Sequence, residues 1–338
     1  MPKIDITKTE LVWPGKYNDD GTLKEATRVN LPFQVIETVN ESRATREAKK
    51  SGIQRGLFDV WEGKEGDTFE DGWRNKLVWG DNLVVMGSLL EKFAGKIDLV
   101  YIDPPFATGS DFSFTTEIGE SGEEISKEQS TIEEKTYRDT WGRGYDSYLQ
   151  MMYDRLLLIR ELLSEHGSLY VHCDWRVNYL LRSILDELFG AKAFQNEIVW
   201  GYKTQGATKR RYSRKHDTIF FHSKTENFTF NYQTERSYMQ HTYGFDKEDF
   251  KVDEEGRQYR DAIVRDFWEI PAIQSASYEN LRFETQKPEA LLKRIIKSSS
   301  NEGGLVADVF CGLRWTPSLG QDRGNVKVGF RYPQWVWC

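Results

Sequence analysis

The sequence predicts an α/β fold with a largely parallel sheet, and three observations support this prediction. Between residues 76 and 312, short apolar segments alternate with longer segments whose apolar residues recur at helical spacing. Two short segments, 97–103 and 168–174, are almost continuously apolar, as is typical of strands covered on both faces. Both segments end on an aspartate. Since ligands of such sheets bind outside the carboxyl ends of the strands, the strand ends mark a functional edge.

The predicted elements follow one another in a regular order. A first strand ends at Asp81, and the helix after it stops at Gly95. A second helix is expected to continue to Gly167, and the last helix begins at Pro288, a residue suited to a first helical turn. We expect strands at 76–81, 97–103, 168–174, 197–203, 217–224 and 305–312. We expect helices at 82–95, 147–167, 176–190 and 287–300. The residues that should share the carboxyl edge are Asp81, Asp103, Asp174 and Gly312.

Three stretches do not follow this alternation. Residues 1–75 are polar and poorly periodic, and we interpret them as an extension that wraps over the core. Residues 107–140 are a long, acid-rich loop, which is either a lid over the site or a solvated loop. Residues 225–285 break the rhythm of helices and strands.

Composition narrows the class of protein. The chain has 46 Lys and Arg against 53 Asp and Glu, a net charge of −7, so no global basic field indicates nucleic-acid binding, although a local stripe would suffice. Its three cysteines form no disulfide framework, which favours a reducing, cytoplasmic location. No signal segment or membrane span is predicted. The five histidines (His166, His172, His216, His222 and His241) show no metal-ligand spacing, so we expect no metal and assign them structural roles.

The turn Asp103-Pro104-Pro105-Phe106 carries the chemistry. The Asp103 carboxylate accepts hydrogen bonds, and Pro105 holds Pro104 extended so that its carbonyl is free to face a ligand. Two acceptors beside the aromatic ring of Phe106 suit a planar base with an exocyclic amine, such as adenine N6 or cytosine N4. The alternative is that Asp-Pro-Pro simply terminates a strand.

Methyl transfer is the reaction that such a pocket would assist. The exocyclic amine is a weak nucleophile because its lone pair is delocalised into the ring. Two fixed acceptors favour a pyramidal nitrogen and stabilise the positive charge that develops on it. Further acceleration comes from holding the nitrogen in line with the methyl group, and stacking on Phe106 offsets part of the cost of extruding the base from a duplex.

With these residues in order, the chain resembles the amino-methylating DNA methyltransferases. It is most similar to the beta-group adenine enzymes, which include the modification subunits of type III restriction systems. The matching segments, in order, are WGDNL, YIDPPFATGSDF, GSLYVHCDWRVNYLLRSILDELFG, FQNEIVWGYK, KHDTIFFHSK, TQKPEALLKRII and ADVFCG. The resemblance implies a Rossmann-like methyltransferase fold with permuted motif order, in which Asp103, Pro104, Pro105 and Phe106 hold the target base. An aspartate at the first place favours adenine N6 over cytosine N4.

The resemblance also implies the cofactor, S-adenosyl-L-methionine. It places the turn of Asp308, Phe310 and Gly312 against the cofactor and the segment of Thr285 and Lys287 near its methionine end. Asp81 is a weaker candidate for the adenosyl side. From the residues alone, Asp308 and Asp81 are better explained as turn aspartates.

The connection 203–215 is a candidate DNA-binding segment. It contains six cations and no acid next to the expected site, which favours phosphate contacts over a merely solvated loop. The six cations are Lys203, Lys209, Arg210, Arg211, Arg214 and Lys215.

These assignments divide the chain into four parts. An extension (1–75) precedes the catalytic half of the methyltransferase domain (76–224), a target-recognition region (225–285) and the cofactor-binding half (286–338). The expected partners are double-stranded DNA, a restriction nuclease subunit and a second copy of the chain, with no membrane. Two alternatives remain open: a cytosine-N4 methyltransferase, and a DNA-binding subunit of a restriction system that lacks the cofactor.

The resemblance ends abruptly after Gly312. The second glycine expected in the turn is replaced by Arg314. This replacement matters because only a residue without a side chain lets the backbone approach a cofactor closely. The acid expected to bind the ribose hydroxyls is replaced near Arg331, and Pro317 and Gly320 interrupt the helix in between. Either the protein is degenerate and binds DNA but methylates it poorly, or a frameshift or truncation after about Gly312 leaves an unrelated tail. The abrupt loss of the resemblance favours the second explanation.

Overall fold

The computed structural model describes the parts of the chain that build the domain. The described residues are 9–26, 28–32, 76–106, 114–118, 123–127, 144–203, 209–238, 250–274, 277, 279–280, 286–310 and 326–331. No helix among them is long and apolar enough to cross a membrane.

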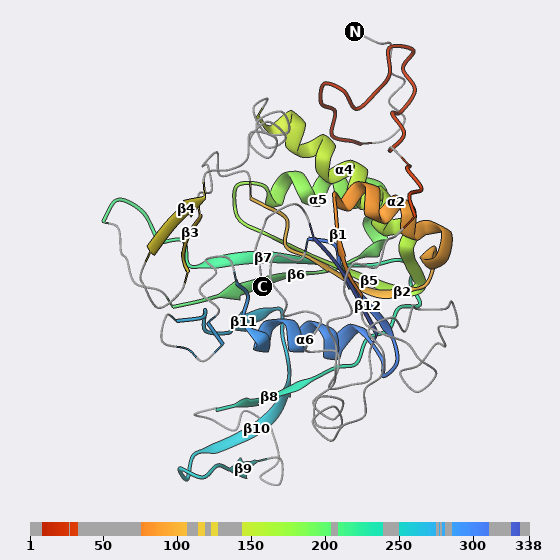
Figure 1. The fold of residues 1–338 in the computed structure, drawn as a ribbon. Coiled ribbons are helices and arrows are strands. Elements are labelled where there is room, and N and C mark those ends of the chain that lie inside the picture. Colours follow the sequence, from red (N-terminus) through yellow and green to blue (C-terminus); the bar gives the residue numbers. More distant parts are fainter. Residues whose placement is uncertain are drawn as a thin grey trace, which may run out of the picture.

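An eight-stranded sheet forms the centre of the molecule (Figure 1). Its strands lie in the order β1-β13-β12-β2-β5-β7-β6-β11, and every neighbouring pair is parallel except the two pairs that involve β7. This confirms the predicted α/β fold with a largely parallel sheet. The strands are β1 (Lys76–Trp79), β2 (Ile97–Ile102), β5 (Leu163–Cys173), β6 (Phe194–Gly201), β7 (His216–Ser223), β11 (Phe267–Glu269), β12 (Leu305–Asp308) and β13 (Val326–Arg331).

Helices cover both faces of this sheet (Figure 1). One face carries α2 (Asn82–Phe93), α4 (Tyr145–Leu162) and α5 (Asn178–Phe189), and the other carries α6 (Glu289–Ser299). A short 3₁₀ turn (Ala191–Ala193) leads from α5 into β6. The two cores draw alternately on β2, since Val100 and Ile102 face the three-helix side whereas Leu99 and Tyr101 face α6. A strand buried on both faces needs apolar residues at nearly every position, which explains the continuous runs in the sequence.

The topology brings the ends of the strands to one edge, as predicted. The parallel strands β1, β12, β2 and β5 end there, and Asp81, Asp103 and Asp174 follow three of them. Because β7 runs antiparallel, it begins at the same edge with His216, which is paired with Gly201 at the end of β6. Gly312 lies outside the described residues.

The helix expected to continue to Gly167 ends earlier, at Leu162, and β5 begins at Leu163. Gly167 is therefore a strand residue. A Cβ atom at this position would lie 2.8 Å from the Ile97 carbonyl oxygen and 2.9 Å from that of Ser164, where the register of β2 and β5 shifts. This glycine permits close approach of two backbones, which from sequence looks the same as a helix stop.

Two further stretches contain strands that the sequence did not reveal. Residues 107–140, expected to be a loop, include an antiparallel hairpin of β3 (Phe114–Ile118) and β4 (Glu123–Lys127). The stretch 225–285 forms a small antiparallel sheet of β8 (Thr234–Ser237), β10 (Gln258–Ile263) and β9 (Lys251–Val252), and it also supplies β11 to the edge of the main sheet. The small sheet projects below α6 in Figure 1.

Residues near the N-terminus pack on the three-helix face. Trp13 is buried against Tyr153 of α4, and its indole Nε1 donates to Gln150 Oε1 at 2.9 Å. Lys16 is buried as well, and its ammonium lies 2.6 Å from Glu10 Oε2 and 2.8 Å from Glu187 Oε2 of α5. These contacts tie the segment 9–26 to two helices.

Strand β13 lies parallel between β12 and β1, with Arg331 paired to Trp79. Arg331 therefore ends the strand that the resemblance expects to end on an acid. Arg314, Pro317 and Gly320 lie outside the described residues, so the frameshift hypothesis stays a prediction.

Candidate functional site

The site begins where the carboxyl ends of β12 and β2 lie side by side. These strands are neighbours, but the chain leaves β2 toward β5 on one side, whereas β12 has its next strand, β13, on the other. Such a point of reversal opens a crevice outside the carboxyl ends of the strands, where ligands of open α/β sheets bind. Asp103 follows β2 and Asp308 ends β12, so two carboxylates flank this crevice.

Asp103 is held at the crevice by a lysine that precedes α6. Lys287 Nζ lies 2.5 Å from Asp103 Oδ2, and the Asp103 side chain remains 19% exposed. Pro104 is buried, while Pro105 and Phe106 are half-buried. The Phe106 ring packs against the three-helix core on one side, and Lys287 Nζ lies 5.9 Å from its centroid. The carboxylate and the ring thus lie close together, and neither is fully buried.

A buried histidine connects Asp103 to the neighbouring strands. His172 of β5 has its Nδ1 3.0 Å from the Tyr101 hydroxyl and 3.7 Å from Asp103 Oδ1. Its Nε2 lies 3.2 Å from Asp217 Oδ2 at the start of β7. The ring also packs edge-on against Trp200 of β6. Four strands therefore fix this imidazole directly behind the candidate catalytic aspartate.

Asp217 is the far end of this connection. Burial alone would raise the pKa of the Asp217 carboxyl group. The hydrogen bond from His172, the charges of His172 and Lys287, and the hydrogen bond from the Tyr202 hydroxyl together outweigh burial, so this pKa is lowered. Asp217 is therefore an acceptor that stays ionised near neutral pH. The same contact, with burial as the largest cause, raises the pKa of Tyr202 to about 12.

The candidate cofactor residues on the other side of the crevice have structural contacts of their own. Asp81 caps α2, since its Oδ1 accepts from the Leu83 amide at 2.9 Å, and its Oδ2 pairs with Arg155 at 3.4 Å. The buried Asn82 accepts from Arg155 and donates to the Val309 carbonyl at 2.9 Å, so it connects Arg155 to the residue that follows β12. These contacts explain Asp81 as a helix cap, and its role toward a cofactor stays a prediction.

Asp308 closes β12 with a tight turn, in which its Oδ1 accepts from the Phe310 amide at 3.0 Å. Both residues are buried. Thr285 and Gly312, the other cofactor candidates, lie outside the described residues. Lys287 is the residue of the predicted cofactor set that the structure brings next to Asp103.

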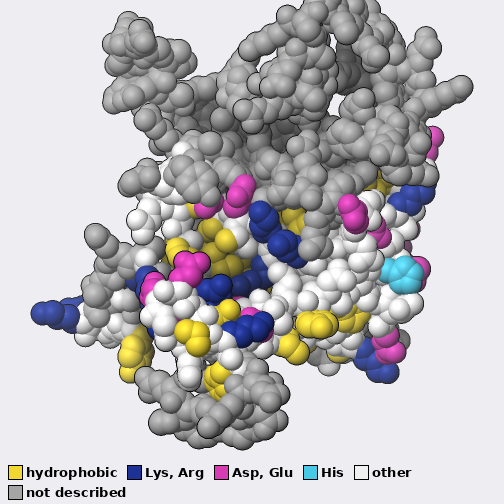
Figure 2. Space-filling view, turned by 90° about the horizontal axis from the view of Figure 1, so that it is seen from below, with side chains coloured by type: hydrophobic (Ala, Val, Ile, Leu, Met, Phe, Trp, Pro, Cys, Tyr) yellow, Lys and Arg dark blue, Asp and Glu magenta, His cyan; other side chains and the backbone are white. Residues whose placement is uncertain are grey.

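The basic connection leaves the sheet at this same edge. Lys203 follows β6, and the stretch from Lys209 to Lys215 leads into β7. The side chains of Lys209, Arg210, Arg211 and Arg214 are exposed. Figure 2 shows Lys and Arg side chains gathered near the middle of the face seen from below, although acids outnumber bases in the sequence.

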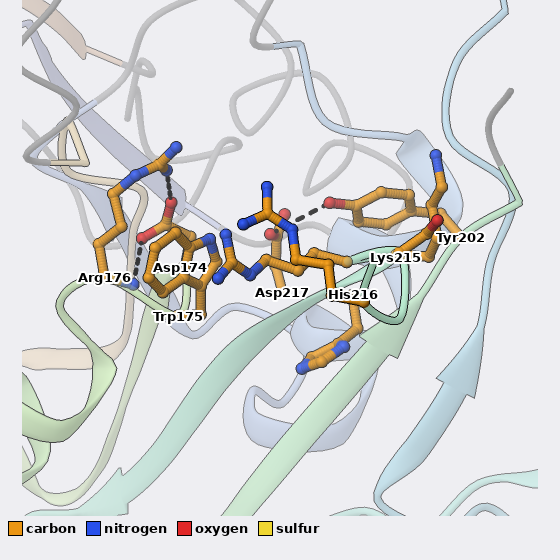
Figure 3. Close-up of a pocket in the computed structure, with 10 residues that line it drawn as sticks. Asp174, Trp175, Arg176, Tyr202, Lys215, His216 and Asp217 are labelled. Carbon is orange, nitrogen blue, oxygen red and sulfur yellow. Dashed lines mark hydrogen bonds and ion pairs between the residues drawn. The ribbon is translucent and has the colours of Figure 1, made fainter. Parts of the chain in front are cut away.

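A cavity of about 490 Å³ lies beside this connection (Figure 3). Its wall combines the turn after β5, the end of β6 and the segment 211–217. Sequence reasoning missed the contributions of Trp175, Arg176 and Tyr202, and it gave His172 only a structural role. Their position in the sequence was the available signal, because Trp175 and Arg176 come after the aspartate that follows β5, as Pro104 comes after the aspartate that follows β2.

Among the described residues, no group of three or more His, Cys, Asp or Glu side chains is arranged to hold a metal ion. Cys173 lies near the site but is a poor nucleophile, because burial, with nearby Asp174 and Asp217, raises the pKa of its thiol well above the usual range.

Comparison with known proteins agrees with this geometry. The model of a family described as DNA methylase matches residues 97–318. The type II methyltransferase M.HpaI of Haemophilus parainfluenzae is 28% identical over 218 residues, which cover 64% of this chain and 58% of that protein. The DNA adenine methyltransferase YhdJ of Escherichia coli (strain K12) is 25% identical over 257 residues, covering 75% of this chain and 76% of YhdJ.

A third relative is the Mod subunit of the type III restriction-modification enzyme EcoP15I of Escherichia coli. It is 28% identical over 158 residues, which cover 44% of this chain and 24% of the subunit. The chain thus spans about a quarter of this subunit and less than two thirds of M.HpaI.

Proposed function

Because the chain belongs to the DNA methylase family, we propose that it transfers a methyl group from S-adenosyl-L-methionine to N6 of an adenine in double-stranded DNA. The observation that carries the proposal is the arrangement at the end of β2. A partly exposed Asp103 is fixed between Lys287 and His172, with the Phe106 ring beside it. Such a group can receive a planar base that bears an amine.

The crevice between β12 and β2 suits the cofactor chemically. The methionine end of S-adenosyl-L-methionine carries a carboxylate and an ammonium, which are complementary in charge to Lys287, paired with Asp103, and to the buried carboxylate of Asp308 at the end of β12. We propose that these two residues, together with Phe310, Gly312, Thr285 and Asp81, hold it. The bound cofactor supplies an electrophilic methyl group on a sulfonium.

The residues of the chain then prepare the base. A carboxylate has about four lone-pair positions, so Asp103 can accept from the base amine while Lys287 and His172 fix its orientation. The Pro104 carbonyl accepts the second amine hydrogen, and Phe106 covers one face of the ring. When the methyl group passes to N6, its bond to sulfur would break and leave a neutral thioether, and the nitrogen would carry an extra proton that an oxygen of Asp103 can accept.

Adenine is favoured over cytosine N4 as the target. The aspartate at position 103 supports it, and relatives such as YhdJ are named as adenine methyltransferases. The DNA contacts that we propose involve the cations of 203–215, and we propose 225–285 as the region that reads the sequence. A restriction nuclease subunit and a second copy of the chain are the proposed protein partners.

The test is to identify the product. The protein is incubated with methyl-labelled S-adenosyl-L-methionine and unmethylated DNA, and the DNA is digested to nucleosides. Label in N6-methyl-2′-deoxyadenosine is expected, whereas label in N4-methyl-2′-deoxycytidine would contradict the choice of base. Calorimetry with the cofactor separates the remaining alternative, since absence of both label and binding heat would favour a DNA-binding subunit without a cofactor.

The departure after Gly312 is tested separately by resequencing the gene. A single-base change that restores a second glycine and an acidic strand end is expected. If no single-base change restores a Gly-x-Gly-Thr reading followed by an acidic strand end, the frameshift hypothesis is wrong.

A further inference from the structure

The cavity beside the basic connection carries a local excess of positive charge. Four of its lining side chains are cations: Arg176, Arg211, Arg214 and Lys215. Two carboxylates, Asp174 and Asp217, also line it. Both carboxylates are engaged, since Asp174 pairs with Arg176, and Asp217 accepts from His172 and Tyr202. In a chain of net charge −7, this cavity presents a local excess of positive charge.

Two of these cations, Arg176 and Arg214, lie over the ring of Trp175, and Arg214 is the closer of the two. The Arg214 guanidinium lies 3.5 Å from the centroid of the Trp175 ring, and Trp175 itself is 42% exposed. The contact joins the basic connection to the turn after β5, two segments about forty residues apart in the sequence. A guanidinium stacked in this way keeps its hydrogen-bond donors free for a phosphate while it loses less conformational freedom on binding.

The cavity lies next to the proposed base site but is distinct from it. His172 separates the two, because its Nδ1 faces Asp103 whereas its Nε2 faces Asp217 in the cavity wall. Asp103 and the cavity thus lie at the same edge of the sheet, on either side of one histidine. Figure 3 shows Trp175 and Arg176 on one side of the cavity, with Lys215 and Tyr202 on the other.

We propose that this cavity binds the phosphodiester of the DNA strand next to the target nucleotide, with Trp175 as the positioning residue that orients Arg214. The inference rests on the proposed function, since it assumes a DNA substrate with its target base at Asp103. It adds a site built from Trp175 and Arg176, outside the basic connection, to the phosphate contacts expected of that connection. As a consequence, the protein would contact the backbone of the DNA strand beside the extruded base as well as along the duplex.

The test measures how DNA binding depends on salt. A fluorescently labelled duplex is titrated with the full chain in the absence of cofactor, over a series of KCl concentrations, and anisotropy gives the Kd. Each phosphate contact contributes about 0.9 to the slope of log affinity against log salt. Arg214→Ala is expected to weaken binding about three- to tenfold and to lower that slope by about one. Lys192→Ala is the matched control, because it removes the same charge before β6, at the opposite edge of the sheet.

Trp175 is tested by a double-mutant cycle. Trp175→Ala should lower affinity and slope as Arg214→Ala does, and the double variant should bind no more weakly than Arg214→Ala alone. Trp175→Phe, which keeps an aromatic face, should retain the wild-type slope. An additive double variant would overturn the positioning role of Trp175.

The phosphate site itself is overturned if Arg214→Ala keeps the wild-type slope, or if Lys192→Ala lowers it equally. Methylation of the same DNA by the unmodified protein is measured in parallel. If that protein methylates DNA while Arg214→Ala binds normally, the cavity proposal fails and the proposed function stands. If it neither binds nor methylates DNA, the proposed function fails as well.

Discussion

Two buried histidines, His172 and His222, lie on the neighbouring strands β5 and β7 and have opposite surroundings. His172 lies near the carboxyl edge on the α6 side and has Tyr101, Asp103 and Asp217 within reach. His222 lies near the other edge on the three-helix side, where neither ring nitrogen has a hydrogen-bond partner and the nearest carboxylate, Asp186, is 3.6 Å away. Both side chains are fully buried.

The difference shows how one sheet serves two purposes. At the carboxyl edge, polar groups from several strands satisfy one another and leave Asp103 facing a crevice, so the cost of burying them is offset by hydrogen bonds. At the other edge, His222 packs beside Phe189 and Phe194 as if it were an aromatic core residue. Substitutions at the first edge should therefore change activity, and substitutions at the second should change stability.

The largest effect is expected at Asp103. Asp103→Ala removes the carboxylate that accepts from the base amine, and loss of one such group typically costs about 10²- to 10³-fold in rate. The measurement is the initial rate of methyl transfer to DNA, with DNA affinity determined separately. The affinity should be nearly unchanged, because phosphate contacts supply most of it. Retention of the full rate in Asp103→Ala would place the chemistry elsewhere.

The next effect is a loss of stability in acid that originates at His222. Burial lowers the pKa of His222 to about 4, although the charge of Asp186 partly opposes the shift. The unfolded chain, with an ordinary pKa of about 6.5, binds a proton that the folded protein does not. Stability due to this group is therefore fully present above about pH 6.5 and is lost as pH falls toward about 4. At pH 5 the loss amounts to about 2 kcal/mol.

Denaturant unfolding at pH 7 and pH 5 measures this loss. His222→Leu should reduce the drop in unfolding free energy between the two pH values by about 2 kcal/mol. The exposed His166 provides the control, and His166→Leu should leave the drop as it is in the parent protein. An equal drop in the parent and in His222→Leu would mean that other groups cause the acid sensitivity.

Sequence reasoning reached the carboxyl edge because its signals are local. The segments 97–103 and 168–174 each end on an aspartate. The residues before the aspartate are almost all apolar, because a strand buried on both faces needs apolar side chains at nearly every position. The crevice residue Asp103 was therefore identified from the turn that follows its strand. The same reasoning failed at Gly167, because a glycine that stops a helix and one that lets two strands approach are alike in the sequence.

The cavity and the contacts of His172 were out of reach for a different reason. They depend on strand order, which places β7 between β5 and β6 and reverses its direction. Only that arrangement sets Asp217 against His172 and Arg214 on Trp175. Strand pairing between distant segments leaves no periodic mark in a single sequence, so these neighbours become visible only in three dimensions.

The smallest effect is expected at His172, and it tests the comparison directly. His172→Gln keeps a polar group toward Asp217 but removes the ring behind Asp103. The Asp103 carboxylate is then less well oriented, so kcat for methyl transfer should fall about tenfold. The KM for DNA should stay constant, because His172 touches no phosphate in the proposed complex. His222→Gln, the same change at the other edge, should leave kcat unaltered at neutral pH and lower the unfolding free energy instead. Equal effects of both variants on kcat would remove the distinction between a functional and a structural edge, because general loosening of the sheet would then explain both.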